Sequence, residues 1–270
     1  MKIPQLFSKM ISSKGSSNCS ARVHFWRSGE TNLGYFLQSK DSDQVICVDV
    51  PDGDQVLTLL KAKGWKLSAL LLTHDHHDHV NGLEQVVKKT GCAFYASKPF
   101  SDLSRLHVSD HLEWEIEGFK VVALDTSGHI DSHFSYLFPE LNLCFCADCL
   151  FQWGCGRMFT GPKELFWTSI LRLRSLPDET LMCCGHDFRE DNLAFIQNEL
   201  SGWSEAQAIA SQIQQSMQSD SVHEPFLIGE QKRTNPFLRA DDPDLAQVVG
   251  RAGKKPEEVF AELRKRRNAY

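Results

Sequence analysis

Residues 68–79 read SALLLTHDHHDH, an apolar run followed directly by a cluster of histidines and aspartates. The run Ala69–Leu72 has the length and composition of a short buried strand. The six residues after Thr73 contain four imidazoles and two carboxylates, the side chains that bind zinc and similar divalent ions. A solvated polar loop is the alternative, but histidine-rich tracts of this kind are typical of metal binding. The segment therefore predicts a metal site at the end of a strand.

The spacing within this cluster divides its candidate ligands into two pairs. His74 and His76 lie on the same side of an extended loop, which predicts that they bind one ion. Asp78 and His79 come two and three residues later, so they can face a second ion. The cluster alone thus accounts for part of a site with two metals.

Single polar residues follow three further apolar runs. His129 follows Val121–Leu124, Asp148 follows Leu141–Cys146, and His186 follows Leu181–Cys184. Open α/β sheets gather functional groups beyond the carboxyl ends of their strands, so these residues are expected to join the cluster. Asp49, after the run Val45–Val48, and His133 are expected to support ligands rather than to bind an ion.

The order of apolar runs and helical segments predicts an α/β fold. Helices are expected at Asp54–Lys63 and at Gly82–Thr90, the second ending at Gly91. After His186 apolar residues recur at helical spacing, which predicts a mainly helical region over residues 189–270. The residues that carry this spacing are Leu193, Ile196 and Leu200, then Ile209, Ile213 and Met217, and, after Pro256, Val259, Phe260 and Leu263.

Composition excludes several classes of protein. The 270 residues are 41% hydrophobic and 24% charged, as in globular proteins. No apolar run approaches the roughly 20 residues of a membrane span, and a net charge of −6 argues against a nucleic-acid partner. Nine cysteines, an odd number partly inside apolar runs, favour reduced thiols and a cytoplasmic location. The first 29 residues have five basic residues and no acid, so an organelle-targeting segment is the alternative to a frayed terminus.

The series THxHxDH, GH, Asp, GH resembles the ligand series of the metallo-β-lactamase superfamily. Within it, the chain is most similar to the hydroxyacylglutathione hydrolases, or glyoxalase II enzymes, and the similarity spans residues 22–270. The matching motifs are GHIDSHFSY at 128–136, CADCLFQWGCGRMF at 146–159, CGHDFREDNLAF at 184–195, TNPFLR at 234–239 and LRKRRNAY at 263–270. The resemblance implies an N-terminal extension over residues 1–20, an αββα sandwich over 21–188 and a helical glutathione-binding domain over 189–270.

The resemblance also implies a centre of two divalent metal ions, zinc in the first place, with iron and manganese as alternatives. It assigns His74, His76 and His129 to the first ion, Asp78, His79 and His186 to the second, and Asp148 to both. Asp78 and Asp148 are the implied catalytic residues. Metal binding lowers the pKa of water towards 7, so a bridging hydroxide becomes the nucleophile.

The implied reaction is hydrolysis of S-(2-hydroxyacyl)glutathione, typically S-D-lactoylglutathione, to glutathione and a 2-hydroxy acid, as in methylglyoxal detoxification. The partner is then a small-molecule thioester, and a monomer is expected. A persulfide dioxygenase with one iron and a hydrolase of another thioester or a lactone are the enzymatic alternatives. The remaining alternative is a non-catalytic protein that binds metal or glutathione.

The implied substrate-binding residues are Arg157, Phe159, Phe188, Arg264 and Arg267. The two phenylalanines stand where the family has tyrosines. Arg264 and Arg267 have i, i+3 spacing, which places both on one helical face, and a solvated basic face is the alternative interpretation. Two further departures from the family pattern, at His77 and at 31–33, are not expected to touch a ligand.

Overall fold

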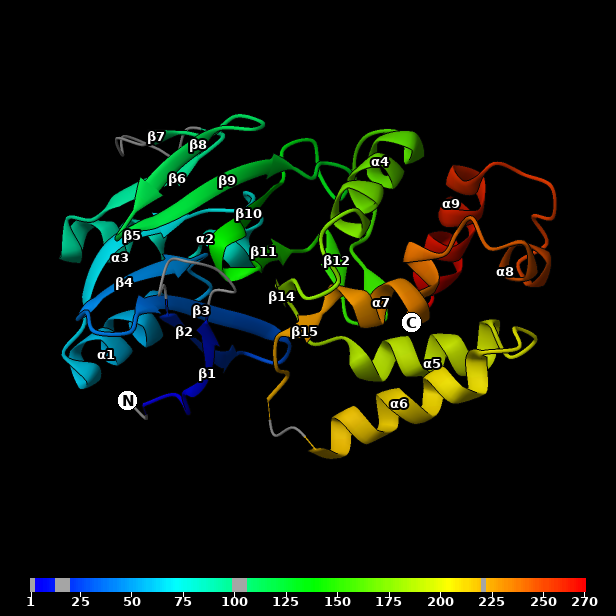
Figure 1. Ribbon diagram of the computed structural model, residues 1–270, viewed down its shortest axis with the longest axis horizontal. Coiled ribbons are helices and arrows are strands. Elements are labelled where there is room, and N and C mark those ends of the chain that lie inside the picture. Colours follow the sequence, from blue (N-terminus) through cyan, green and yellow to red (C-terminus); the bar gives the residue numbers. More distant parts are fainter. Residues whose placement is uncertain (1–2, 13–19, 99–105, 220–221) are drawn as a thin grey trace. The chain divides into compact units, whose positions relative to one another are not determined.

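The computed structural model describes residues 3–12, 20–98, 106–219 and 222–270 (Figure 1). The chain forms two compact units, and each is described by itself. Unit 1 comprises residues 1–125 and 132–146, and unit 2 comprises residues 126–131 and 147–270. Within the described ranges, every helix is too short or too polar to cross a membrane. Cys19 and two of the five basic residues near the N-terminus, Lys2 and Lys14, lie outside the described residues.

Unit 1 contains a seven-stranded sheet whose strands pair in chain order (Figure 1). The first four strands are antiparallel, and the remaining pairs are parallel. Parallel neighbours need crossover connections, and helices supply them after β4 and β5. The strands are β1 (Phe7–Ser12), β2 (Ser20–Ser28), β3 (Asn32–Ser39), β4 (Gln44–Val48), β5 (Lys66–Leu71), β6 (Ala93–Ala96) and β7 (Leu106–His107), and the helices are α1 (Gly53–Lys63), α2 (His77–Val80) and α3 (Leu83–Thr90).

The sheet has one layer of apolar core on each of its two faces. On one face, apolar residues of α1 and α3 such as Leu59 and Val86 pack with Trp26 and Phe36 of the strands. On the other face, a second sheet follows, formed in unit 1 by β8 (Glu113–Ile116), β9 (Phe119–Asp125), β10 (Phe134–Phe138) and β11 (Leu143–Ala147). The turn η1 (Pro139–Leu141) links β10 to β11. The sheets meet through aromatic pairs, including Tyr35 with Phe145 at 5.7 Å.

Unit 2 is mainly helical, as predicted for the C-terminal region. The buried Phe260 is central to its core, because its ring makes edge contacts with Phe166 and Phe237. Helices α5 and α6 lie side by side (Figure 1). Its elements are β12 (Leu150–Phe151), β13 (Gly154–Cys155), α4 (Lys163–Arg174), β14 (Leu181–Cys184), α5 (Arg189–Glu199), α6 (Ala206–Ser219), β15 (Phe226–Leu227), α7 (Ile228–Thr234), η2 (Pro236–Leu238), α8 (Pro243–Val248) and α9 (Pro256–Arg267).

The structure confirms the α/β class and the strands predicted at 45–48, 121–124 and 181–184. The strand predicted at 69–72 is present but spans Lys66–Leu71. The strand predicted at 141–146 begins at Leu143 instead, because Asn142 has a positive φ of 47° after the 3-10 turn. The predicted frayed terminus is wrong over Phe7–Ser12, since these residues form β1 and pair with β2. The predicted domain boundary at residue 188 stays a prediction.

Candidate metal centre

Asp49 organises the histidine cluster in unit 1. Parallel pairing of β4 with β5 carries it to the cluster, where its backbone N–H donates to the Leu71 carbonyl oxygen at 3.0 Å. Its Oδ1 accepts from the Thr73 N–H at 2.8 Å, and its Oδ2 accepts from the Thr73 hydroxyl at 2.7 Å and from His79 Nδ1 at 2.7 Å. The residue is buried and has a left-handed φ of 56°, an uncommon conformation that the three bonds hold in place.

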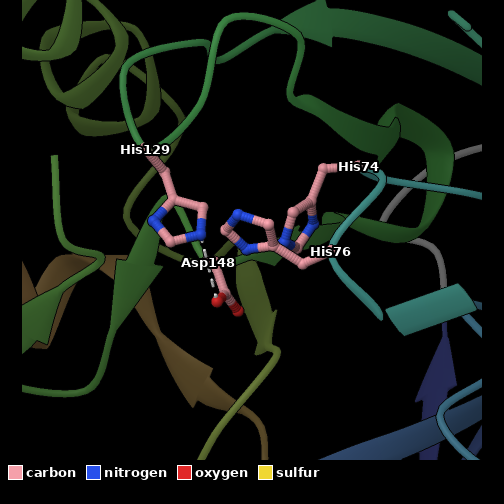
Figure 2. Close-up of side chains that lie close together, drawn as sticks. All are labelled: His74, His76, His129 and Asp148. Carbon is pink, nitrogen blue, oxygen red and sulfur yellow. Dashed lines mark ion pairs between the residues drawn. The ribbon is translucent and has the colours of Figure 1, made fainter. Parts of the chain in front are cut away.

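These bonds set the tautomers of two imidazoles. His79 Nδ1 donates to the Asp49 carboxylate, so Nε2 carries the lone pair that can bind an ion. The Thr73 hydroxyl donates its only hydrogen to Asp49, so it accepts from His74 Nδ1 at 3.0 Å. His74 therefore has the same tautomer as His79. The ring of His74 lies 4.1 Å from that of His79. It lies 4.7 Å from the ring of His76 (Figure 2). Three predicted ligands therefore come together within unit 1.

Asp78 lies in α2 with a half-exposed carboxylate. Its Oδ2 is 4.0 Å from His79 Nε2 and accepts from Asn32 Nδ2 at 3.0 Å. Asn32 Nδ2 also donates to the Asp78 carbonyl oxygen at 3.2 Å. The expectation that residues 31–33 touch no ligand is therefore wrong, because the turn between β2 and β3 places Asn32 against α2.

Unit 2 brings together the three predicted ligands that follow separate strands. Asp148 Oδ2 lies 3.5 Å from His129 Nε2 and 3.4 Å from His186 Nε2 (Figure 2 shows the first pair). Two ligand atoms bound to one tetrahedral ion at 2.0–2.1 Å are about 3.4 Å apart. The distance between Oδ2 and each Nε2 atom is therefore that of two ligand atoms that bind the same ion.

His129 is oriented by backbone rather than by a side chain. Its Nδ1 donates to the Arg157 carbonyl oxygen at 2.8 Å, so its Nε2 also carries the lone pair. Gly156 is needed next to it, since a Cβ there would meet the Asp148 carbonyl oxygen and lie 2.8 Å from His129 Nδ1. Gly128 has a φ of 134° and packs directly on Phe166 of α4, which excludes other residues.

The chemistry of both donor groups fits divalent metal ions. The imidazoles of His74, His79 and His129 direct Nδ1 to oxygen atoms, an arrangement typical of metal-binding histidines. The remaining donors of both groups include carboxylates, which zinc, iron and manganese all accept. Burial raises the pKa of the Cys144 thiol and raises that of Cys155 to about 11, so neither is a thiolate ligand near neutral pH.

Phe159 and Phe188, which stand where the resembled family has tyrosines, contact the imidazoles of two candidate metal ligands. The Phe159 ring lies edge-on to His129 at 5.2 Å, and its N–H donates to the His129 carbonyl oxygen at 3.0 Å. Its side chain is 59% exposed, which leaves it open to a ligand. Phe188 stacks on His186 with centroids 5.0 Å apart. Arg157 is exposed beside them.

Arg264 and Arg267 are buried in unit 2, so the solvated basic face is wrong as an interpretation. The Arg264 guanidinium donates to the Cys155 carbonyl oxygen at 2.7 Å, and its burial lowers its pKa to about 10. Arg267 Nε donates to Asn192 Oδ1 at 2.8 Å, and its Nη2 lies 3.3 Å from Asp191 Oδ2. Both guanidiniums thus bind groups of the chain itself.

Sequence reasoning missed the asparagines that hold the site. Asn32, Asn192 and Asn235 are neither charged nor part of a ligand spacing, so residue type did not single them out. Asn192 and Asn235 lie inside two of the family-like motifs, 184–195 and 234–239, and this is the one signal that pointed to them.

Two family models match parts of this chain. A family model described as "Hydroxyacylglutathione hydrolase C-terminus" matches residues 187–270, and one described as "Metallo-beta-lactamase superfamily" matches residues 37–102. A hydroxyacylglutathione hydrolase of Rhodopseudomonas palustris (strain BisB5) is 36% identical over 241 residues, which cover 88% of this chain and 94% of the relative.

Solved structures show the same fold at lower identity. ETHE1 from Myxococcus xanthus matches with a TM-score of 0.62 and 22% identity, over 96% of this chain and 90% of that one. TTHA1623, solved in a di-iron-bound form, matches with a TM-score of 0.53 and 22% identity, over 84% of this chain and 99% of that one. The predicted metallo-β-lactamase fold is therefore confirmed. With a relative of 36% identity along nearly its whole length, the chain belongs to the hydroxyacylglutathione hydrolase family of the metallo-β-lactamase superfamily.

Proposed function

We propose that the protein hydrolyses the thioester of S-(2-hydroxyacyl)glutathione, in the first place S-D-lactoylglutathione, to glutathione and a 2-hydroxy acid. The observation that carries this proposal is the position of Asp148, whose Oδ2 faces the Nε2 atoms of His129 and His186 at 3.5 and 3.4 Å. One carboxylate oxygen at this distance from two imidazoles suits a ligand shared by two ions. Membership of the hydroxyacylglutathione hydrolase family supports the substrate.

Membership of the hydroxyacylglutathione hydrolase family supports a centre of two ions. We assign one ion to His74, His76 and His129, the second to Asp78, His79 and His186, and Asp148 to both. The oriented imidazoles support this assignment, because each Nδ1–H is bound to oxygen and each Nε2 is left as the ligand atom. When bound, two divalent ions, most favourably zinc and alternatively iron or manganese, would lower the pKa of a water and offset negative charge on the substrate carbonyl.

The chain's own residues fix where this reaction takes place. Asp148 places one carboxylate oxygen 3.5 Å from His129 Nε2 and 3.4 Å from His186 Nε2, and Asn32 holds the Asp78 carboxylate beside His79. Water adds its oxygen to the thioester carbonyl carbon, the carbon–sulfur bond breaks, and glutathione leaves as a thiolate that takes up a proton. No serine or cysteine nucleophile is required for this sequence of steps.

The substrate pocket is proposed around segment 157–159. Arg157 is exposed next to the carbonyl that orients His129, so its guanidinium can pair with a glutathione carboxylate. Phe159 and Phe188 provide apolar surface against the ligand imidazoles. Arg264 and Arg267 stay predictions as substrate-binding residues, because their guanidiniums bind groups of the chain in this structure.

Steady-state hydrolysis of S-D-lactoylglutathione by metal-loaded protein tests the proposal. Asp148→Asn is the matched control, and a thioester without glutathione is assayed alongside. Turnover of the glutathione thioester that the control loses supports the proposed reaction. Turnover of the other thioester alone overturns the substrate, and turnover of neither overturns the proposed function.

The remaining proposals concern partners and location. We propose a monomer that acts on a small-molecule thioester. We also propose a cytoplasmic location, which the cysteine composition favours. Gel filtration with light scattering and fractionation of expressing cells test these two points. An elution as a stable dimer, or recovery in an organelle fraction, would contradict them.

A further inference from the structure

We propose that Asn235 is a positioning residue for the metal centre. It holds the β12–β13 hairpin (150–155), and this hairpin sets the position of the Arg157 carbonyl that orients His129. The inference rests on the proposed function only in treating His129 as a metal ligand and Arg157 as a substrate-binding residue. All the residues that carry it lie in unit 2.

Asn235 is fully buried and bridges the two strands of the hairpin. Its Nδ2 donates to the carbonyl oxygens of Phe151 and Gly154, each at 3.1 Å. These residues face each other in the strand register, so a single amide joins both strands. Its Oδ1 accepts from the Phe237 N–H at 3.0 Å, which fixes the orientation of the amide.

Other side chains bind the rest of the hairpin backbone. Gln231 Oε1 accepts from the Trp153 N–H at 2.6 Å, and Asn192 Nδ2 donates to the Gln152 carbonyl oxygen at 3.0 Å. Arg264 donates to the Cys155 carbonyl oxygen at 2.7 Å. Each residue from 151 to 155 thus has a backbone group bound to a side chain of α5, α7, α9 or the residue before η2. The hairpin is held by its surroundings.

The hairpin's own structure explains why it needs this support. Each strand has two residues, and hairpins of this size are marginal on their own. Trp153 at the turn has a left-handed φ of 57°, which is costly for an aromatic residue. Its ring Nε1 donates to Thr234 Oγ1 at 3.1 Å, which ties the turn to α7. Loss of the external bonds should therefore let the hairpin move.

Both ends of the hairpin lead into the ligand group of unit 2. Leu150 follows Asp148 by two residues, and Cys155 is followed by Gly156 and Arg157. Gly156 packs against the Asp148 carbonyl, and the Arg157 carbonyl accepts from His129 Nδ1. A shift of the hairpin would thus weaken the bond that sets the His129 tautomer, and it would move the Arg157 side chain at the same time.

Asn235→Asp is the most specific variant. It keeps an oxygen for the Phe237 N–H but replaces the donor to the two hairpin carbonyls by an acceptor. Ile213→Ala in α6 is the control, because Ile213 is buried in the same unit and lies outside these hydrogen bonds. Both variants should lower Tm, so Tm alone does not separate a positioning role from a structural one.

The test measures zinc affinity by titration of the metal-free full-length protein, together with hydrogen exchange of the peptide spanning 150–157. Asn235→Asp is expected to weaken the affinity for one zinc ion by about 10–100-fold and to speed exchange in this peptide. Ile213→Ala is expected to change neither beyond its global loss of stability. A variant with lower Tm but wild-type zinc affinity and exchange would overturn the proposal.

Hydrolysis kinetics of the same variants separate this proposal from the proposed function. Asn235→Asp is expected to raise KM for S-D-lactoylglutathione as well as to lower kcat, because Arg157 moves with His129. If the wild type hydrolyses no glutathione thioester but Asn235→Asp still weakens zinc binding, the proposed function fails and the positioning role stands. If Asn235→Asp does not fold, Thr234→Val gives the milder test, and unchanged zinc affinity with unchanged exchange at 150–157 would again contradict the proposal.

Discussion

The two ligand groups are built in different ways. In unit 1 the candidate ligands crowd into one stretch, 74–79, and the Asp49 carboxylate orients His79 from a neighbouring strand. In unit 2 the ligands come from three separate segments, and the backbone carbonyl of Arg157 orients His129. A side chain that orients a ligand can be removed by one substitution. A backbone carbonyl can be displaced only through the elements that hold it, so the second group depends on helices remote in sequence.

Substitution of the shared ligand is expected to have the largest effect. Asp148→Ala should abolish binding of both ions and lower kcat/KM for S-D-lactoylglutathione by at least about 10³-fold, since both imidazoles of unit 2 lose their common partner. Bound metal is measured by elemental analysis beside the kinetics. Asp75→Ala, at an exposed non-ligand position of the motif, is the control. Surviving hydrolysis in Asp148→Ala would show that the carboxylate does not bridge two ions.

Acid should destabilise unit 1 through His24. This histidine is buried between Ser8 and Gln38, and burial lowers its pKa to about 4 from 6.5. Between these values the unfolded chain binds a proton that the folded chain does not, so stability falls as pH falls from 6.5 towards 4. The loss amounts to about 3 kcal/mol at most.

Urea unfolding between pH 4 and 7 measures this dependence. His24→Leu should flatten the slope in that window relative to wild type, whereas His111→Leu, at an exposed position, should not. The difference between variant and wild type isolates the contribution of His24 to the slope. Equal slopes for wild type and His24→Leu would refute the expectation.

The orienting carboxylate of unit 1 can be tested separately from unit 2. Asp49→Asn keeps the shape of the side chain but replaces the charged carboxylate, which accepts hydrogen bonds from Thr73 and His79, by a neutral amide. The expected result is a 10- to 100-fold weaker affinity for one metal ion, in the range typical of partners of metal-binding histidines. Zinc titration measures it, and Asp54→Asn on α1 serves as the control. Unchanged affinity would mean that the loop alone orients the histidines.

The smallest effect is expected in the pocket. Phe159→Tyr adds a hydroxyl to an exposed ring beside His129, where the family has a tyrosine. A neutral hydrogen bond to glutathione would lower KM by several-fold to about tenfold. Phe188→Tyr, measured in parallel, shows whether the second missing hydroxyl acts in the same way. An unchanged or higher KM in both variants would argue for a different substrate.

The candidate metal ligands could be predicted from sequence, because their residue types and their positions after apolar runs are characteristic. The cluster 74–79 combines a strand pattern with metal-binding side chains, so both its place and its chemistry could be predicted. His129, Asp148 and His186 are single residues, but each follows an apolar run, so their positions at strand ends predict that they join the cluster, and the family-like motifs add their assignment to particular ions. Asp49 could be predicted as a supporting residue because it ends a strand next to the cluster.

The parts that sequence did not reveal depend on packing between distant segments. Strands β2 and β3 alternate polar and apolar residues irregularly, so their pairing was not predicted. The buried arginines Arg264 and Arg267 look like solvated charges in sequence, and their contacts with Cys155 and Asn192 arise only in the folded chain. Asn235 has no distinguishing chemistry until two hairpin carbonyls surround its amide.

Strand β1 constrains how the N-terminus can be processed or engineered. Residues Phe7–Ser12 pair with the first six residues of β2, from Phe7 opposite Phe25 to Ser12 opposite Ser20. Proteolytic removal of residues 1–20, or a truncation designed on that boundary, would remove this strand and expose β2 as a new edge. Exposed edges of this length promote pairing between molecules. A cut before Phe7 would leave the sheet intact, so purification tags with a cleavage site are best placed ahead of that residue.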